Sequence, residues 1–191
     1  MEKGIGKLLG IIFGIVTLVL IAVTFVVDLG TVTLKGTYLG YTISVTSNTT
    51  YFGVTSSGHF SSWANATKGL TGSNLNKANT GIDMIYASIG TMIVALIFAI
   101  IGIVAVFGKS SKMMKSMAFI APVISAILII IIIVLYYEGT VTLLGATTSA
   151  SPYSSILTST ISLAIGAYLA IVAVITEFLA AGFSFLSGGK N

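Results

Sequence analysis

The 191-residue chain contains no cysteine and no arginine, and only 7% of its residues are charged. Without cysteine, neither a disulfide framework nor a thiolate metal site can form, so any part of the chain outside a membrane is held by hydrogen bonds and packing alone. An ordinary soluble domain carries about 25% charged residues, so this composition excludes that class. The net charge of +4 comes from lysines spread along the chain, which does not indicate a nucleic-acid-binding surface.

Groups that perform enzyme chemistry are equally scarce. One histidine and five acids are scattered along the chain, and they cannot form a Ser-His-Asp arrangement, a carboxylate dyad or a pair of haem ligands. A single imidazole needs partners to hold a metal ion, so we interpret His59 as a solvated surface residue. The sequence therefore predicts no catalytic site, no cofactor, no metal site, no small-molecule substrate and no nucleic-acid partner.

Long apolar runs dominate the rest of the sequence. Hydrophobic residues make up 55% of the chain, and the mean hydropathy is +1.07. Four segments are long enough to cross about 30 Å of hydrocarbon as helices, namely residues 5–27, 83–107, 116–137 and 156–183. The first exceeds the roughly 7 to 15 residues of a signal-peptide core, so we expect an uncleaved helix. The predicted fold is an all-α membrane protein, a four-transmembrane-helix bundle that forms one integral membrane domain over residues 1–191.

The positions of the lysines predict the orientation of this bundle. One set of predicted helix ends carries Lys3, Lys7, Lys109, Lys112, Lys115 and Lys190. Because lysines concentrate on the cytoplasmic side of membrane helices, we expect both termini inside, in a cell membrane or a virion envelope. The loops at residues 28–82 and 138–155 are then external, and their richness in Ser, Thr, Gly and Asn agrees with exposure to water.

A short motif occurs twice in the sequence. Residues 30–36 read GTVTLKG and residues 139–145 read GTVTLLG, each after an apolar run and an acid, Asp28 or Glu138. The copies are one helical hairpin apart, which predicts two parallel helical-hairpin repeats. Alternating Thr and Val or Leu has the period of two that is typical of a strand. We expect both copies to be strands of one sheet, formed by Thr31, Val32, Thr33, Leu34, Thr140, Val141, Thr142 and Leu143.

The first external loop contains further strand signals. β-branched and aromatic residues alternate over residues 38–45 and 50–54, with a hairpin turn expected at residues 47–49, so a small extracellular antiparallel sheet is predicted. Asn48 and Asn65 lie in N-x-[ST] sequons and are candidate glycosylation sites. Beyond these strands the loop loses its periodicity, and we expect an irregular or short helical return to the second membrane helix.

Small residues recur at intervals of four in two of the predicted helices. Gly6, Gly10 and Gly14 form a stripe in the first helix, and Gly166 and Ala170 form a weaker one in the fourth. In lipid, such stripes let two helix backbones approach closely. The stripe therefore predicts either self-association between copies of the chain or packing inside one four-helix bundle.

Apart from Asp83, the first residue of the second predicted span, Glu177 is the only acid inside a predicted span. A charge near the bilayer centre costs about 2.5 to 3.5 kcal/mol, so this carboxylate needs a partner. Counted inward from the external ends, Lys7 and Glu177 both lie about 30 Å deep, which predicts an intramembrane ion pair near the cytoplasmic interface. A proton or ion relay is the alternative. Pro122 lies inside the third span and predicts a kink.

The predicted arrangement resembles the claudin-like tetraspan group, which has four helices, both termini inside, a larger first external loop rich in strands and a smaller second loop that adds one more. The resemblance covers topology only. Trp63 is the sole tryptophan, Gly69 and Leu70 are not followed by a second Trp, and the cysteine pair is missing, so no ion chemistry is carried over. The abundance of Ile, Thr, Ser and Lys without Cys or Arg resembles proteins of thermoacidophilic archaea and their viruses.

These features together predict a structural membrane protein that associates with itself through lateral, cell-surface or envelope contacts. Its expected partners are the lipid bilayer and either further copies of itself or other membrane subunits. One alternative is an accessory, non-catalytic subunit of a larger membrane complex of respiratory or secretion type. A second alternative is an oligomeric channel formed around polar helix faces.

Overall fold

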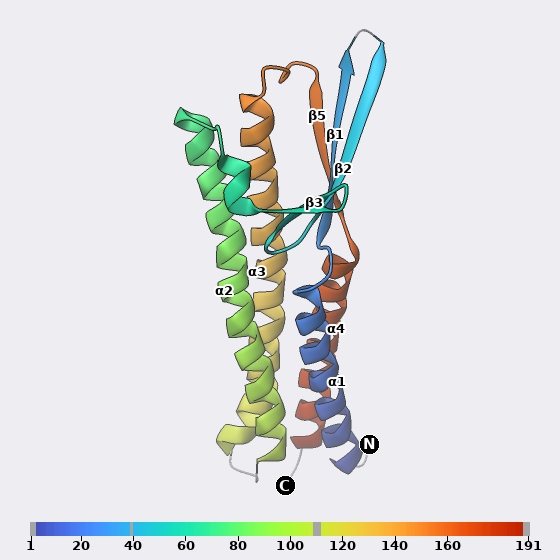
Figure 1. Ribbon diagram of the computed structural model, residues 1–191. Coiled ribbons are helices and arrows are strands. Elements are labelled where there is room, and N and C mark those ends of the chain that lie inside the picture. Colours follow the sequence, from blue (N-terminus) through green and yellow to red (C-terminus); the bar gives the residue numbers. More distant parts are fainter. Residues whose placement is uncertain (1–2, 39, 109–111, 189–191) are drawn as a thin grey trace. The chain divides into compact units, whose positions relative to one another are not determined.

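The structure is a computed structural model that describes residues 3–38, 40–108 and 112–188. This part of the chain is mostly helical and also contains a small antiparallel sheet (Figure 1). The helices are α1 (Lys3–Thr24), α2 (Gly72–Phe107), α3 (Lys112–Ala150) and α4 (Ile165–Gly188), with a short 3-10 helix η1 (Trp63–Thr67). The strands are β1 (Gly30–Tyr38), β2 (Tyr41–Thr49), β3 (Gly53–Ser56), β4 (His59–Ser62) and β5 (Leu157–Leu163).

Four helices of the described chain are long and apolar enough to cross a membrane, as the sequence predicts. Helices α1 and α4 contain 22 and 24 residues, which gives lengths of about 33 and 36 Å. Helices α2 and α3 contain 36 and 39 residues and reach about 54 and 58 Å. The two central helices are therefore about 24 and 28 Å longer than the hydrocarbon core of a bilayer, which is about 30 Å thick.

The second copy of the repeated motif is helical, so the strand predicted at Thr140–Leu143 is wrong, and the loop predicted at residues 138–155 is helical as far as Ala150. Helix α3 continues through the motif to Ala150. The Thr140 hydroxyl donates to the Tyr136 carbonyl one turn earlier at 2.8 Å, which lets a β-branched residue sit within a helix. Leu143 and Ala146, three residues apart, are buried together on one face, a helical spacing.

The strand that joins β1 from the C-terminal half of the chain is β5, inside the segment predicted as the start of the fourth membrane helix. Its sequence LTSTISL alternates polar and apolar residues except at Ser159, and this pattern favours a strand over a helix. Helix α4 consequently begins at Ile165 rather than at residue 156. Helix α2 starts at Gly72, earlier than the predicted residue 83.

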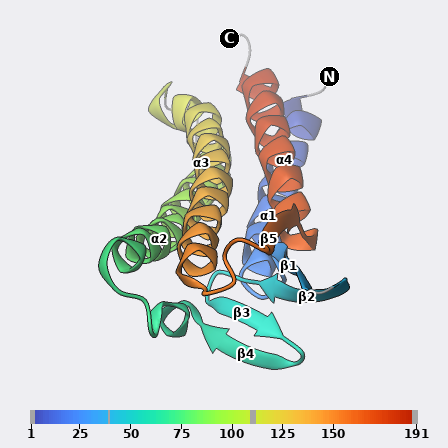
Figure 2. The same ribbon diagram turned by 90° about the horizontal axis from the view of Figure 1, so that it is seen from above.

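The sheet has the strand order β4-β3-β2-β1-β5, and its paired neighbours are antiparallel. Strands β1 and β2 pair along their whole length, from Gly30 opposite Thr49 to Tyr38 opposite Tyr41. The predicted turn at residues 47–49 is wrong, because β2 runs through them. The chain reverses after Thr49 instead, where the Thr50 amide donates to the Gly53 carbonyl at 2.9 Å. The β3–β4 hairpin turns away from the direction of β1 and β2 (Figure 2).

The chain divides into two compact units. Unit 1 contains α1, the segment Gly90–Ile132 of α2 and α3, and α4 from Tyr168 onward. Unit 2 contains Phe25–Ile89 and Ile133–Ala167. It therefore includes the whole sheet, the N-terminal part of α2 and the C-terminal part of α3. Helices α2 and α3 thus contribute to both units.

Aromatic residues form the centre of unit 2. The Tyr51 ring lies edge-on to Tyr136 at 5.3 Å and next to Phe25 at 5.7 Å. The Trp63 indole Nε1 donates to the Tyr51 carbonyl at 3.0 Å, and the Tyr136 hydroxyl donates to the Thr50 carbonyl at 3.3 Å. Both polar ring atoms therefore have partners, as buried aromatic residues require, and they fix the start of β3 against α3.

Candidate functional site

Strands β1, β2 and β5 form a three-stranded ribbon with two chemically different faces. Successive side chains of a strand point to opposite sides of a sheet. The register places Leu34 opposite Val45, and Gly36 opposite both Ile43 and Leu157. These residues lie on one face, which is therefore apolar.

The other face of the ribbon consists mainly of hydroxyl groups. Thr33 lies opposite Thr46 and Thr160, and Lys35 lies opposite Ser44 and Thr158. The hydroxyls of Thr33 and Thr46 are 3.2 Å apart and bond to each other across the strands. Water can form hydrogen bonds with these hydroxyl groups, so this face is stable in contact with solvent and needs no protein partner.

The apolar face of the ribbon is uncovered in a single chain. Tyr41 and Ile43 are 79% and 68% exposed, and Val45 is also exposed. This face borders an open groove of about 470 Å³, lined by Leu34, Gly36, Ile43, Val45, Tyr153, Ile156 and Leu157. Contiguous exposed apolar surface of this kind usually marks an interaction site.

The ribbon also has two unpaired edges among the described residues. Strand β3 pairs with β2 only at Asn48 and Thr49, so the outer edge of β2 from Tyr41 to Ser47 has no neighbouring strand. Strand β5 pairs with β1 alone, which leaves its other edge open. Unpaired edges offer backbone donors and acceptors to another strand.

Asp28 fixes the base of the ribbon. Its carboxylate accepts a hydrogen bond from the Asn48 side-chain amide at 2.8 Å, and its carbonyl accepts one from the Gly166 amide at 2.9 Å. A side chain at Gly166 would meet this carbonyl, since a Cβ built there lies 2.8 Å from the oxygen. The sequence marks Asp28 only as the acid before the motif and gives no sign of these contacts.

The two glycosylation candidates occupy different surroundings. Asn48 is half-buried in β2, and its amide nitrogen is engaged with Asp28. Asn65 is exposed on η1. An oligosaccharide needs a free amide nitrogen at the surface, which only Asn65 presents.

The small-residue stripe of α1 faces other helices of unit 1. A Cβ built on Gly10 would lie 2.7 Å from the Ser184 hydroxyl of α4, and one built on Gly14 would lie 2.6 Å from Ile103 of α2. Gly6 and Ala170 are buried. The stripe therefore packs inside one chain, which is the second of the two interpretations that the sequence allows.

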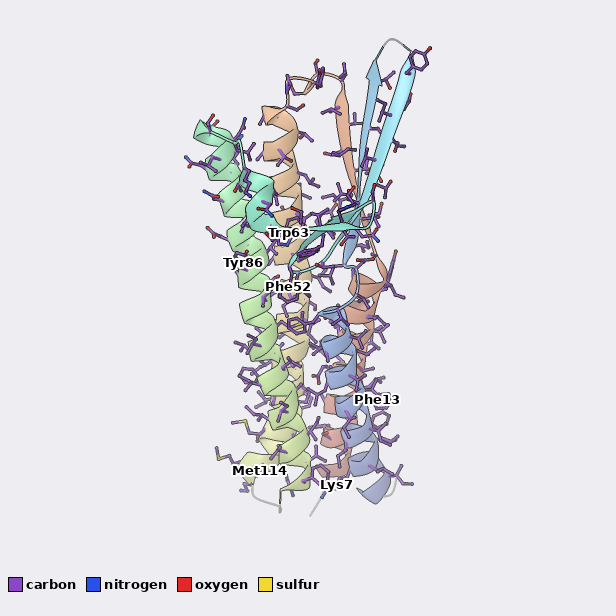
Figure 3. The ribbon with its side chains drawn as sticks, in the orientation of Figure 1. Lys7, Phe13, Phe52, Trp63, Tyr86 and Met114 are labelled. Atoms are coloured by element: carbon purple, nitrogen blue, oxygen red, sulfur yellow. The ribbon has the colours of Figure 1, made fainter. Side chains whose placement is uncertain are left out.

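The predicted ion pair between Lys7 and Glu177 does not form. Lys7 is exposed near the start of α1 (Figure 3), while Glu177 is 1% exposed and its carboxylate oxygens have no hydrogen-bond partner among the described residues. The hydroxyls of Thr17 and Thr176 lie 2.6 Å apart, so Glu177 is level with the middle of α1. Lys7 is ten residues from Thr17, about 15 Å along the helix.

The predicted depth of Glu177 is wrong because the fourth helix begins later than expected. With α4 spanning Ile165–Gly188, Glu177 lies about 18 Å from one end and about 16 Å from the other. It is therefore a mid-helix residue and does not lie near either end of α4. The sequence could not reveal this, because the apolar residues of β5 extend the hydrophobic run.

The remaining reactive residues do not gather into a site. His59 is exposed on β4, with its Nδ1 3.2 Å from the Ser57 carbonyl. Within the described residues there is no group of three or more His, Cys, Asp or Glu side chains that could hold a metal ion. No model of a known protein family matches the chain, and no curated protein matches its sequence.

Proposed function

We propose that this chain is a structural membrane protein that associates with itself through the apolar face of the β1–β2–β5 ribbon. The observation that carries the proposal is the exposure of Tyr41, Ile43 and Val45 on β2, which pairs with β1 along its whole length. An apolar surface of this kind that stays exposed to water favours aggregation. A matching surface on a neighbouring copy would cover it.

The helix lengths support a membrane position for unit 1. Its portions of α2 and α3, residues 90–107 and 112–132, are about 27 and 31 Å long, which matches a hydrocarbon core of about 30 Å. The continuations in unit 2 carry Asn, Lys, Asp, Glu and Thr side chains. We therefore place unit 2 outside the bilayer and the ends with Lys7 and Lys112 inside, in accordance with the positive-inside rule.

A second copy of the chain is the best partner for the ribbon. Copies inserted in one membrane with the same orientation present their ribbons at the same height, so identical surfaces can meet laterally. The apolar face carries no charge, and the single lysine of the ribbon, Lys35, lies on the opposite face. Like-charge repulsion therefore does not oppose association of two apolar faces.

The double variant Ile43→Thr/Val45→Thr tests this proposal. Threonine keeps the β-branched shape that favours a strand but reduces the apolar surface. Burial of an aliphatic side chain contributes about 1.5 to 3 kcal/mol, so two substitutions per copy weaken association by at least about tenfold. The matched control is Ser44→Thr, which changes the polar face of the same strand.

Molar mass in mild detergent, measured by light scattering, reports the outcome. We expect the wild type and the Ser44→Thr control to form a multiple of the 19.8 kDa chain, and the double variant to dissociate at the same concentration. A monomeric wild type contradicts the proposal, and so does an unchanged mass in the double variant. Foreign chains that co-purify in a fixed ratio favour the accessory-subunit alternative instead.

A further inference from the structure

Glu177 is buried in the middle of unit 1, and no other described residue of that unit is acidic. Its carboxylate oxygens have no hydrogen-bond partner among the described residues. An ionised carboxylate without a partner is strongly destabilising in an apolar interior. Unit 1 must therefore supply a cation or a proton to this group.

The described residues that surround Glu177 supply no cation. Together with Glu177, small and apolar groups from all four helices line one small space, including Gly10, Gly14, Ala99, Gly102, Pro122 and Ser184. None of the residues that line this space, apart from Glu177 itself, is charged or titratable. The space also leaves no room for a water molecule, so a hydrated ion does not fit there.

Ser125 of α3 is the buried hydroxyl group that we consider as an acceptor for a protonated Glu177. Its side chain lies close to the Glu177 carboxyl group, but its hydroxyl hydrogen is used in a 3.1 Å bond to the Ala95 carbonyl of α2. A hydroxyl that already donates elsewhere offers only its lone pairs. Ser125 can thus accept a hydrogen bond from a carboxylic acid, and it cannot donate one to a carboxylate without giving up Ala95.

We propose that Glu177 is a proton-binding site at the centre of the four-helix unit, where the neutral carboxylic acid donates its proton toward the Ser125 hydroxyl oxygen. The reaction is the binding of one proton by one carboxylate, and no other bond is made or broken. Release of the proton leaves a charge between α1 and α4, next to the hydrogen bond of Thr17 and Thr176. Loss of the proton therefore loosens the packing of these two helices.

Infrared spectroscopy of the protein in lipid vesicles tests the proposal, because a protonated carboxyl group has a C=O stretching band that a carboxylate lacks. The variants are Glu177→Gln, a neutral side chain of the same shape, and the matched control Glu138→Gln, at an exposed acid of α3. We expect the band at neutral pH in the wild type and in the control, and its loss in Glu177→Gln. We also expect Ser125→Ala to shift the band, because the acid loses its acceptor.

Two results would overturn the proposal. The first is a wild-type spectrum without a protonated-carboxyl band at neutral pH, which needs no variant and is decisive even if Glu177→Gln does not fold. The second is a band that persists in Glu177→Gln. Thermal unfolding gives an independent readout. Because the unfolded chain releases this proton first, the wild type should lose stability as the pH rises from the range in which exposed carboxyl groups titrate toward the pH at which the band disappears. Glu177→Gln should lack this loss, and equal pH profiles for the two proteins contradict the proposal.

Discussion

The two glycines that flank the second motif copy, Gly139 and Gly145, provide a sharp test of the helical structure of this segment. A Cβ built on Gly139 lies 2.6 Å from the Gly81 carbonyl of α2, 2.9 Å from Ile85 Cγ1 and 3.0 Å from Met84 Cβ. Gly145 is exposed, and a Cβ built there meets nothing within 4 Å. Both positions lie in α3 within unit 2, so Gly139→Ala and Gly145→Ala form a matched pair.

The expected magnitudes follow from two opposing effects. Alanine in place of glycine favours a helix by about 0.8 to 1 kcal/mol, and this gain is common to both variants. Gly139→Ala also forces a methyl group against the backbone of α2, and overpacking of this kind costs about 1 to 3 kcal/mol. We therefore expect Gly145→Ala to be more stable than Gly139→Ala by about 1 to 3 kcal/mol, the overpacking cost alone.

Thermal unfolding in detergent, followed by circular dichroism, measures this difference. In proteins of this size about 1 kcal/mol shifts the melting temperature by about 2 to 4 °C, so the two variants should melt about 2 to 12 °C apart. Gly145→Ala should equal or exceed the wild type. Equal melting temperatures for the two variants, or a lower one for Gly145→Ala, would refute the helical assignment and the close crossing of α2 and α3.

Three further predictions test single contacts or the surroundings of single residues. Thr17→Val removes the hydrogen bond to Thr176 and should lower the free energy of unfolding by about 0.5 to 1.5 kcal/mol. A double-mutant cycle with Thr176→Val isolates the contribution of the pair, and additive effects of the two substitutions contradict the hydrogen bond. In a host that modifies N-x-[ST] sequons, intact mass should show a glycan that Asn65→Gln removes and Asn48→Gln does not; the reverse pattern contradicts the assigned surroundings. Asp28→Ala leaves the Asn48 amide without its charged acceptor and should cost about 1.5 to 3 kcal/mol by thermal unfolding, and an unchanged stability argues against this link.

The sequence predicts the helical framework well because apolar length is a strong local signal. It also predicts strands at Thr31–Leu34 and in the segments that became β2 and β3, where alternation is visible in the sequence. It does not distinguish the two GTVTL copies, since identical residues adopt opposite structures in them. Tertiary contacts decide between these structures: the first copy pairs with β2 and β5, whereas the second faces the α2 backbone through Gly139.

The candidate sites were less predictable than the helices. The apolar face of the ribbon depends partly on β5, whose apolar residues resemble the start of a membrane helix in sequence. The error in the depth of Glu177 has the same origin, because a later start of α4 moves this acid to the middle of the helix. The role of Ser125 requires knowledge of which carbonyl its hydroxyl contacts, and no sequence pattern carries that information.

Disulfide formation in native membranes tests self-association through the ribbon most directly. The natural chain has no cysteine, so a disulfide formed by a single introduced cysteine joins either two copies of the chain or this chain and a foreign thiol. Ile43→Cys places the thiol on the apolar face of β2, and the control Ser44→Cys places it on the polar face. The account predicts that mild oxidation converts Ile43→Cys, but not Ser44→Cys, to a species of twice the 19.8 kDa chain mass. No such species from Ile43→Cys, or equal amounts from both variants, would contradict it.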